Sequence, residues 1–457
     1  MQGNIYYGDT EIIGRRDVAW PRLTAWASHN VFSCEVRLGK IVPGPSRFSR
    51  IVTPMRSHSS ATDDFRANMD PSQRSGFEKV IRILYVAYPL LTVSQESAGG
   101  AEQVLWTLEQ EMARRGVSTT VAASAGSFVA GELFSTGEPC RNLDDFERRN
   151  REHQEHTAQF ILHRERKGRP FDLVHDMSGS FWPRAGEFQV PLLATLHLPR
   201  HFYPTRLFEN IPPNVKFNCV SQSQAASFAG LISLQSVVAN GIALDFFEPG
   251  LNLNFESDRS RRSGLLWLGR ICEEKAPHLA LEIGERACMP VTIAGQIYPF
   301  SYHQQYFDRE IARRLQRMAK AAFVRPPSAM KKRRLLQEAQ AVVITSQVEE
   351  TSSLVAMEAA ASGTPVIAFA RGALPEMVQD GLTGFLVENV EDALRALQRI
   401  SEISPTSCVR HARECFCSAK MAYGYAKVYS QILARPVLGV RDMGIRECHP
   451  DVRRTGT

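Results

Sequence analysis

The chain has 457 residues, of which 44% are hydrophobic and 22% charged, and its formal net charge is +6. This length is too great for one hydrophobic core, so we expect two domains, or three, in an ordinary soluble globular protein. The small positive charge argues against a nucleic-acid-binding protein, and it is compatible with an anionic small ligand or a weak peripheral membrane contact.

The sequence has no feature of an exported or membrane-spanning protein. No apolar run reaches the length of about 18 residues that crosses a bilayer, and charged residues interrupt the region where a signal peptide would lie. The nine cysteines are scattered, which is typical of reduced thiols in a cytoplasmic protein. No Asp-x-Asp sequence occurs, so we expect no dedicated metal site.

Residues 1–76 differ from the remainder of the chain. The stretch 46–76 is rich in Ser, Arg, Asp and Pro and has no sustained periodicity, so we expect a poorly ordered N-terminal extension. Because the pattern changes abruptly at Val80, one hypothesis is that translation begins at Met55 or Met69.

From Val80 onward, short apolar runs alternate with amphipathic segments. This alternation predicts parallel strands joined by helices, which is a doubly wound α/β domain. We place this N-terminal domain at 77–237. Its predicted strands are 80–88, 117–123, 172–175, 191–196 and 215–220, and its first helix is 101–115.

The α/β pattern starts again after a turn-rich link near 238–249, which predicts a second doubly wound domain at 238–405. Two such domains in tandem leave a cleft between them, and open α/β sheets bind ligands at the carboxyl ends of their strands. The predicted strands are 264–268, 291–294, 341–345 and 365–370, and the predicted helices are 276–286, 331–339 and 354–362.

The segment 349–363 follows the predicted strand 341–345 and reads EETSSLVAMEAAASG. Thr351, Ser352 and Ser353 are good N-cap residues, so a helix is expected to begin there with its free N–H groups pointing into the cleft. Such a helix end is an anion site suited to a diphosphate.

Glu358 lies in this helix, which is apolar nearly all round and is therefore expected to be buried. A buried carboxylate needs a partner. Either it accepts a hydrogen bond from a ligand, such as a ribose hydroxyl, or it is paired with a Lys or Arg in an interdomain contact.

A second candidate site is the sequence 269–275, directly after the predicted strand 264–268. Gly269 permits close backbone approach, and Arg270 and Lys275 can grip a diphosphate and stabilise it as it departs. The alternative is a pair of solvated surface cations.

Further candidates come from the N-terminal domain. Gly99 and Gly100 form a strand-to-helix turn that permits close approach of a phosphate or an acceptor, although most such pairs are only turns. His197 ends a predicted strand and could donate to a reacting group, or it could be a structural histidine. His175 and Asp176 are weaker candidates of the same kind.

Two basic runs, 164–169 and 331–334, are expected to be solvated surface.

Glu350 and Glu358 are separated by seven residues, which resembles the E-x7-E motif of retaining family 4 glycosyltransferases. The resemblance implies that Glu350 contacts hydroxyls of the donor sugar and that Glu358 binds the nucleotide ribose. It also implies that the amides of Ser352, Ser353 and Leu354 hold the sugar and the distal phosphate. The family commonly has Pro-Phe-Gly where this chain has Thr351-Ser352-Ser353, which leaves the identity of the donor sugar open.

The resemblance covers roughly residues 80–432 and includes Gly99-Gly100, His197 and the Gly269-Arg270…Lys275 element. It implies the GT-B fold, in which two Rossmann-like domains face a cleft and a closing helix, here 406–434 before a tail at 435–457, returns to the first domain. The implied activity is metal-independent hexosyl transfer, with retention and without a cofactor, from a nucleoside-diphosphate sugar to an unknown glycan, lipid or small-molecule acceptor. The alternatives are a nucleotide-sugar epimerase-like enzyme and a non-catalytic nucleotide-sugar-binding protein.

Overall fold

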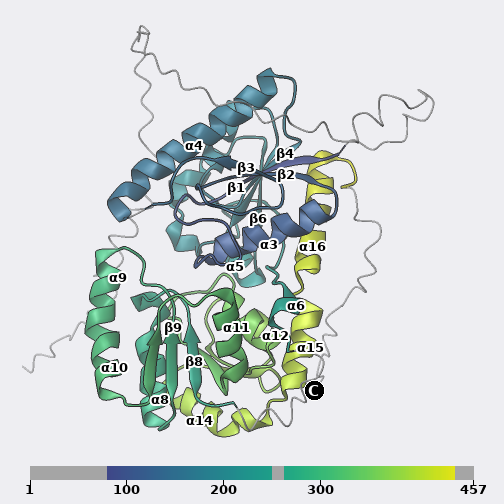
Figure 1. Ribbon diagram of the computed structural model, residues 1–457. Coiled ribbons are helices and arrows are strands. Elements are labelled where there is room, and N and C mark those ends of the chain that lie inside the picture. The colour runs from purple at the N-terminus through teal and green to yellow at the C-terminus, as the bar shows by residue number, and fades with distance from the viewer. Residues whose placement is uncertain (1–79, 141, 250–261, 438–457) are drawn as a thin grey trace, which may run out of the picture.

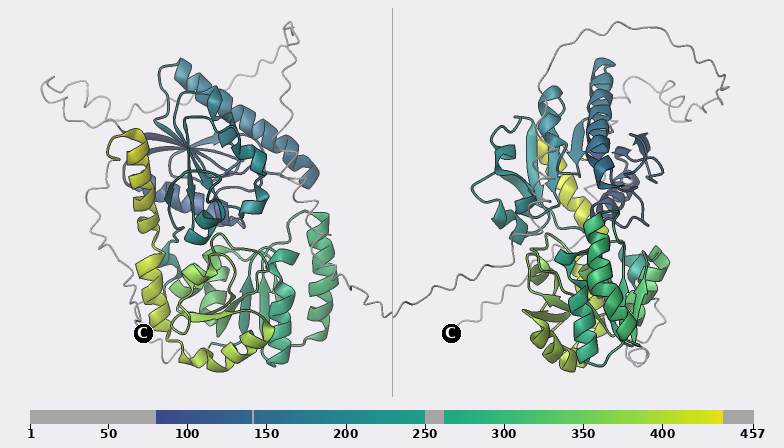
Figure 2. Two further views of the ribbon diagram at one scale, coloured as in Figure 1. Left: turned by 180° about the vertical axis from the view of Figure 1, so that it is seen from behind. Right: turned by 90° about the vertical axis from the view of Figure 1, so that its left-hand side faces the viewer.

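The computed structural model describes residues 80–140, 142–249 and 262–437. The expected N-terminal extension at 1–76, both candidate start sites and most of the expected tail lie outside the described residues. Two parallel sheets with helices on their faces lie one above the other, as Figures 1 and 2 show. The expected pair of doubly wound Rossmann-like domains is therefore confirmed, and the fold is GT-B.

The first sheet has seven strands in the order β3-β2-β1-β4-β5-β6-β7, all paired in parallel. Its central strand is apolar and buried because helices cover both faces. In register, Leu84 lies between Thr120 and Val174. The strands are β1 Arg82–Val86, β2 Ser118–Ala123, β3 Glu132–Ser135, β4 Leu173–Asp176, β5 Leu192–Leu196, β6 Val215–Cys219 and β7 Leu234–Val237. The helices of this part are α3 Gly100–Arg114, α4 Leu143–Arg166 and α5 Gln222–Ser227, with short 3-10 turns η2 Trp182–Glu187, η3 Arg200–Phe202 and η4 Thr205–Phe208.

The second sheet has six parallel strands in the order β10-β9-β8-β11-β12-β13. In register, Leu266 lies between Thr292 and Val342. The strands are β8 Leu265–Leu268, β9 Val291–Ala294, β10 Ala321–Val324, β11 Ala341–Ile344, β12 Val366–Phe369 and β13 Gly384–Val387. The helical elements are α6 Leu244–Phe247, η6 Glu273–Lys275, α8 Pro277–Arg286, α9 Ser301–Tyr306, η7 Phe307–Ala312, α10 Arg313–Arg317, α11 Ala329–Glu338, α12 Leu354–Ala361, α13 Leu374–Met377, α14 Val390–Arg399, η8 Ile400–Glu402 and α15 Pro405–Cys415.

The chain passes between the two domains twice, and the two crossings touch. The amide of Ile242 donates to the carbonyl of Phe416 at 2.8 Å, and the amide of Ser418 donates back to Ile242 at 3.0 Å. A Cβ on Gly241 would lie 2.8 Å from the carbonyl oxygen of Cys417, so a larger residue at position 241 would push the crossings apart.

The closing helix expected at 406–434 is in fact two helices, because the chain breaks its helical path at Phe416 and Cys417. α15 packs into the core of the second domain, and α16 Ser418–Leu433 packs beside α3 in the core of the first. Both helices run along one side of the molecule, in yellow-green and yellow in Figure 1.

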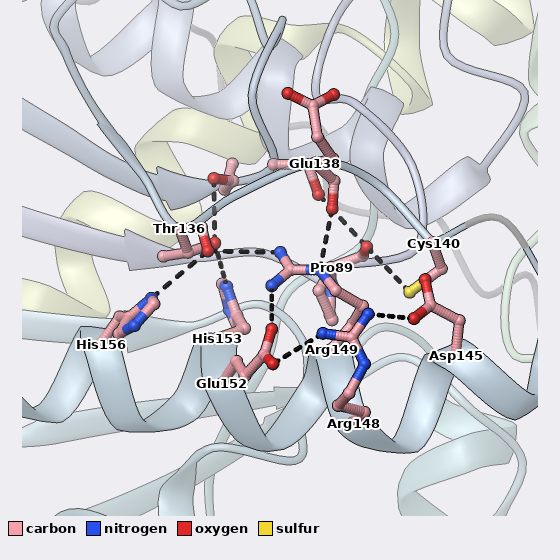
Figure 3. Close-up of polar contacts among 12 residues, drawn as sticks. Pro89, Thr136, Glu138, Cys140, Asp145, Arg148, Arg149, Glu152, His153 and His156 are labelled. Carbon is pink, nitrogen blue, oxygen red and sulfur yellow. Dashed lines mark hydrogen bonds and ion pairs between the residues drawn. The ribbon is translucent and has the colours of Figure 1, made fainter.

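Helix α4 is tied to the segment that follows β3 by polar side chains (Figure 3). Arg149 donates to the carbonyls of Glu138 and Thr136 at 2.9 and 3.2 Å and pairs with Glu152 at 2.7 Å. Nδ1 of His153 lies 2.7 Å from the Thr136 hydroxyl. These bonds fix the start of α4, from which Phe146 reaches the cavity described below.

Within the described ranges, the helices are all too short or too polar to cross a lipid bilayer.

Candidate functional site

A cavity of about 940 Å³ lies between the two domains, lined from both at the carboxyl ends of their strands. This is the position at which open α/β sheets bind ligands. Every residue that the sequence singled out most strongly lies on its wall. They are Gly99, Gly100, His197, Gly269, Arg270, Lys275, Glu350, Ser352, Ser353, Leu354 and Glu358.

The expected helix begins at Leu354, with Ser353 as its N-cap. The Ser353 hydroxyl accepts a hydrogen bond from the amide of Ala356 at 3.3 Å. The amide of Ser353 itself is taken, because it donates to the Met377 sulfur at 3.1 Å. The first-turn amides of Leu354 and Val355 remain available to a ligand, since the first N–H groups of a helix have no intrahelical partner.

Lys275 and Glu350 form an ion pair on the cavity wall. Nζ of Lys275 lies 2.5 and 2.6 Å from the two carboxylate oxygens, and Glu350 also accepts from the Ser346 hydroxyl. The loops that carry the pair are tied together, because the Thr345 hydroxyl donates to the carbonyl of Ala276 at 2.8 Å. The alternative of a solvated Lys275 is therefore wrong.

Arg270 is held over the cavity by two neighbours. Its guanidinium donates to Glu274 at 2.8 Å and lies 5.5 Å from the centre of the Tyr298 ring. Gly269 precedes Arg270 at the end of β8, and Gly295 directly follows β9. A Cβ on Gly295 would lie 1.7 Å from the Gly269 carbonyl oxygen, so the ends of the two strands can meet only because position 295 is glycine. Arg270 is thus fixed at the carboxyl ends of the neighbouring strands β8 and β9.

Glu358 is 2% exposed and pairs with Lys332 of α11, whose Nζ lies 2.6 Å from its carboxylate. Burial raises the pKa of Glu358, and the charge and hydrogen bond of Lys332 partly offset this rise. Both residues line the cavity. The second interpretation of Glu358, a carboxylate paired with a Lys or Arg, is therefore confirmed. The expected interdomain contact is wrong, because Lys332 belongs to the same domain as Glu358.

The expectation that 331–334 is solvated surface was wrong for two of its four residues. Lys332 lines the cavity, and Arg333 donates to the carbonyl of Glu248 at 3.2 Å. The signal was present in the sequence, because Lys332 stands three residues after Ala329 and four before Leu336, and both of these are buried. Residues at that spacing share one helix face. The run 164–169 is mostly exposed, as expected.

Gly99 caps α3 at the turn that the sequence predicted, and Gly100 begins the helix. A Cβ on Gly99 would lie 1.9 Å from a carboxylate oxygen of Glu102, so this carboxyl folds back over the turn. A Cβ on Gly100 would lie 3.7 Å from Leu354, which belongs to the other domain. Gly99 therefore makes room for the Glu102 carboxyl, whereas a side-chain carbon at position 100 would make only an ordinary contact with Leu354. Burial raises the pKa of Glu102 to about 7.

The raised pKa of Glu102 has a measurable consequence. A carboxyl whose pKa is about 7 in the folded state and 4.5 unfolded stabilises the fold fully below pH 4.5, and this stability is lost as the pH rises to about 7. Glu102→Gln should therefore gain stability over the wild type as the pH rises from 5 to 8, by up to about 3 kcal/mol. Urea unfolding of both proteins across this range measures the difference, and a difference independent of pH would contradict the assignment.

Four side chains on the cavity wall carry a buried polar atom that has no hydrogen-bond partner within the described part of the chain: Tyr88 Oη, His197 Nε2, Asn240 Oδ1 and Ser352 Oγ. Native proteins leave few such atoms unpaired, so their concentration in one cavity indicates a polar ligand. Burial lowers the pKa of His197 to about 4, so this ring is neutral near pH 7 and acts as a hydrogen-bonding group.

The weaker candidates His175 and Asp176 are structural, which corrects the sequence interpretation. The His175 ring is buried between the hydroxyls of Tyr429 and Thr195, each at 2.7 Å. The Asp176 carboxylate accepts from the amides of Phe181 and Trp182 at 2.9 Å and shapes the turn after β4.

Direct contacts hold the two domains together at the edges of the cavity. The Thr351 hydroxyl donates to the carbonyl of His197 at 2.8 Å. The Glu96 carboxylate accepts from the amide of Ala329 at 2.7 Å, at the start of α11. Thr351 therefore has a contact that a proline at this position could not make, because proline lacks the hydroxyl.

The sequence predicted no metal site, and no metal-binding motif marks one. The fold nevertheless brings Cys272, Glu274 and His303 together, with one potential ligand atom of each within 4.8 Å of the others. This cluster lies behind the cavity wall that carries Arg270, because Glu274 belongs to both.

Residues 262–402 match the family model of the glycosyl transferases group 1. D-inositol 3-phosphate glycosyltransferase from Mycolicibacterium smegmatis is 24% identical over 407 residues, which cover 80% of this chain and 93% of the relative. The enzyme of the same name from Mycolicibacterium paratuberculosis is 27% identical and covers 74% of this chain and 86% of the relative.

Solved structures have the same fold at low sequence identity. Sucrose-phosphate synthase from Thermosynechococcus elongatus has a TM-score of 0.61 at 20% identity, covering 78% of this chain and 99% of its own. Anabaena HepE, solved in complex with UDP and glucose, has a TM-score of 0.59 at 16% identity, covering 77% of this chain and 99% of its own.

Proposed function

Since residues 262–402 match the glycosyl transferases group 1 and the chain has the GT-B fold, we propose that it belongs to this group and moves a hexose from a nucleoside-diphosphate sugar to an acceptor. The reaction would proceed with retention of the anomeric configuration and without a metal, as in family 4. The binding of UDP and glucose by HepE supports UDP-sugars as the first donors to test.

The diphosphate would lie between the N-terminus of α12 and the two cations Arg270 and Lys275. All three supply positive charge to one cavity, and the helix end adds free N–H groups. As the glycosidic bond breaks, the leaving diphosphate gains charge, which these groups would neutralise. Deprotonation of the acceptor hydroxyl would be assisted by the leaving phosphate, with the neutral His197 ring nearby.

Donor binding requires an exchange of partners at Lys275. Without donor, its ammonium is bound by both oxygens of Glu350. A phosphate that takes over the ammonium would release these oxygens to accept hydrogen bonds from sugar hydroxyls. Glu358 would accept from the ribose in the same way, while Lys332 keeps its charge compensated in the buried position.

One observation carries this proposal. Unpaired buried polar atoms, two cation–carboxylate pairs and a helix N-terminus line a single cavity of about 940 Å³, which is the size and chemistry that a nucleotide sugar needs.

A thermal-shift screen of UDP-, GDP- and ADP-sugars tests the proposal directly. A donor at 100 times its Kd should stabilise the protein by about 2.7 kcal/mol and raise its melting temperature. The variant Ser352→Val lacks an unpaired hydroxyl of the cavity, so the same nucleotide sugar should raise its melting temperature by less. If every nucleotide sugar leaves the melting temperature unchanged, the proposal fails.

A further inference from the structure

A histidine is buried at the back of the cavity wall without a hydrogen-bond partner. His303, on α9, is 1% exposed, and neither of its ring nitrogens has a partner in the parts of the chain that the structure describes. The rings of Tyr298, Phe300 and Tyr302 surround it, with centroids 6.0, 5.3 and 4.4 Å away. A buried imidazole with two unpaired nitrogens is costly unless something binds to it.

Two further metal-binding side chains face this imidazole from the loop after β8. The thiol of Cys272 is fully buried, whereas Glu274 lines the cavity. The Sγ, carboxylate and imidazole atoms all lie within 4.8 Å of one another. Zinc bound to sulfur, nitrogen and oxygen ligands holds them about 3.5 Å apart, so the ligand atoms of the three side chains need to approach one another by about 1 Å at most.

We propose that Cys272, Glu274 and His303 form a zinc-binding site directly behind the Arg270 side of the cavity. One thiolate, one imidazole and one carboxylate are typical zinc ligands, and three protein ligands leave the fourth position open. The thiol loses its proton to solvent as the sulfur–zinc bond forms, so each zinc bound releases one proton from Cys272. The aromatic rings around His303, which also line the cavity, limit the access of water to the site.

Glu274 connects this site to the cavity, because one of its oxygens already binds Arg270. A carboxylate can hold a cation on each oxygen, so zinc and Arg270 share Glu274. The ion enters from the cavity, where the edge of Glu274 is exposed.

The test is a zinc titration of the full chain, stripped of metal beforehand, with a competing chromophoric chelator and no nucleotide present. Wild type should bind one zinc that depends on this cluster. Cys272→Ser and His303→Gln should each lower the affinity for it by more than the roughly 10–100-fold that loss of a second-shell partner costs. Cobalt(II) in place of zinc should give a thiolate-to-cobalt charge-transfer band in the wild type that Cys272→Ser abolishes.

Two other cysteines serve as controls. Cys288 is exposed, and Cys415 lies 3.6 Å from a ring nitrogen of His411, which makes a competing sulfur–nitrogen pair. Cys288→Ser and Cys415→Ser should bind zinc as the wild type does. Unchanged binding in both Cys272→Ser and His303→Gln, or loss only in Cys415→Ser, overturns the proposal, as does a wild type that binds no zinc.

Circular dichroism in metal-free buffer checks that both cluster variants fold. If Cys272→Ser folds poorly, His303→Gln still tests the site, because glutamine retains the approximate size of the histidine side chain. Because the titration contains neither donor nor acceptor, its failure and the failure of the proposed glycosyl transfer are separate results.

Discussion

Replacing Lys275 by alanine should lower kcat by about 100- to 1,000-fold, the loss that follows removal of one group that stabilises developing charge. The Lys275 side chain is 28% exposed, and the Ser346 hydroxyl still donates to the buried Glu350 in the variant, so we expect a smaller loss of stability than for a fully buried pair. The Lys275 charge faces the position proposed for the leaving diphosphate. The variant also leaves the Glu350 carboxylate uncompensated beside that diphosphate. We therefore expect turnover to fall far more than the melting temperature does.

Steady-state kinetics with the donor found by the thermal-shift screen measure this effect. If Lys275 acts mainly in the transition state, kcat and kcat/KM fall by similar factors. Lys331→Ala is the matched control, because this lysine is exposed on the neighbouring α11 and has no place on the cavity wall. A folded Lys275→Ala enzyme whose turnover stays within a few-fold of the wild type would remove Lys275 from the diphosphate site.

Replacing Lys332 by alanine should destabilise the protein by about 3–5 kcal/mol, because the variant leaves a carboxylate buried without its cation. Glu358 is 2% exposed on the cavity wall, so its carboxylate has little access to bulk water in place of Lys332. Burial already raises its pKa in the wild type, and loss of Lys332 raises that pKa further. The carboxyl then stabilises the fold only when protonated, so the destabilisation should be largest near pH 8 and shrink as the pH falls to 5.

Urea unfolding followed by circular dichroism measures this loss. Lys331→Ala should stay within about 0.5 kcal/mol of the wild type. The double variant Lys332→Ala/Glu358→Gln should recover most of the stability but bind the donor more weakly than the wild type, since a neutral amide replaces the charged acceptor proposed for the ribose. Equal, small losses at pH 5 and pH 8 would show that Glu358 has another partner.

The central strands and the site were predictable from the sequence because both have strong local signals. Strand 291–294 was predicted to the residue, and the helix at 354–362 came within one. The central strands are continuous apolar runs, and the site residues stand directly after them. A parallel sheet collects such residues at one edge, so positions far apart in the chain could be expected to meet there.

Several of the elements that the sequence did not reveal lack a strong apolar pattern. Edge strands β3 (ELFS) and β7 (LQSV) are only partly buried and contain no apolar run, whereas β10 (AAFV) is apolar but only four residues long. Helix α4 buries polar side chains, among them Arg149, Asn150, His153 and Thr157, and its apolar periodicity is weak for that reason. Arg149 and His153 are buried because they bond to the segment after β3, a contact that depends on the tertiary fold.

The partners within the site were equally invisible in the sequence. Lys275 meets Glu350 across 75 residues, and Lys332 meets Glu358 across 26. Each cation has several carboxylates nearer in the chain, and only the fold selects among them. The same holds for Thr351, whose hydroxyl finds its acceptor in the other domain.

The return of α16 to the first domain bears on the order in which the protein can fold during synthesis. Tyr425 and Tyr429 are fully buried in the core of the first domain, and Tyr429 supplies the hydroxyl that binds the His175 ring. That core is incomplete until residues 418–433 have left the ribosome. The second domain needs nothing beyond α15 and Phe416, so the domain that is made later is the first to have its whole core available.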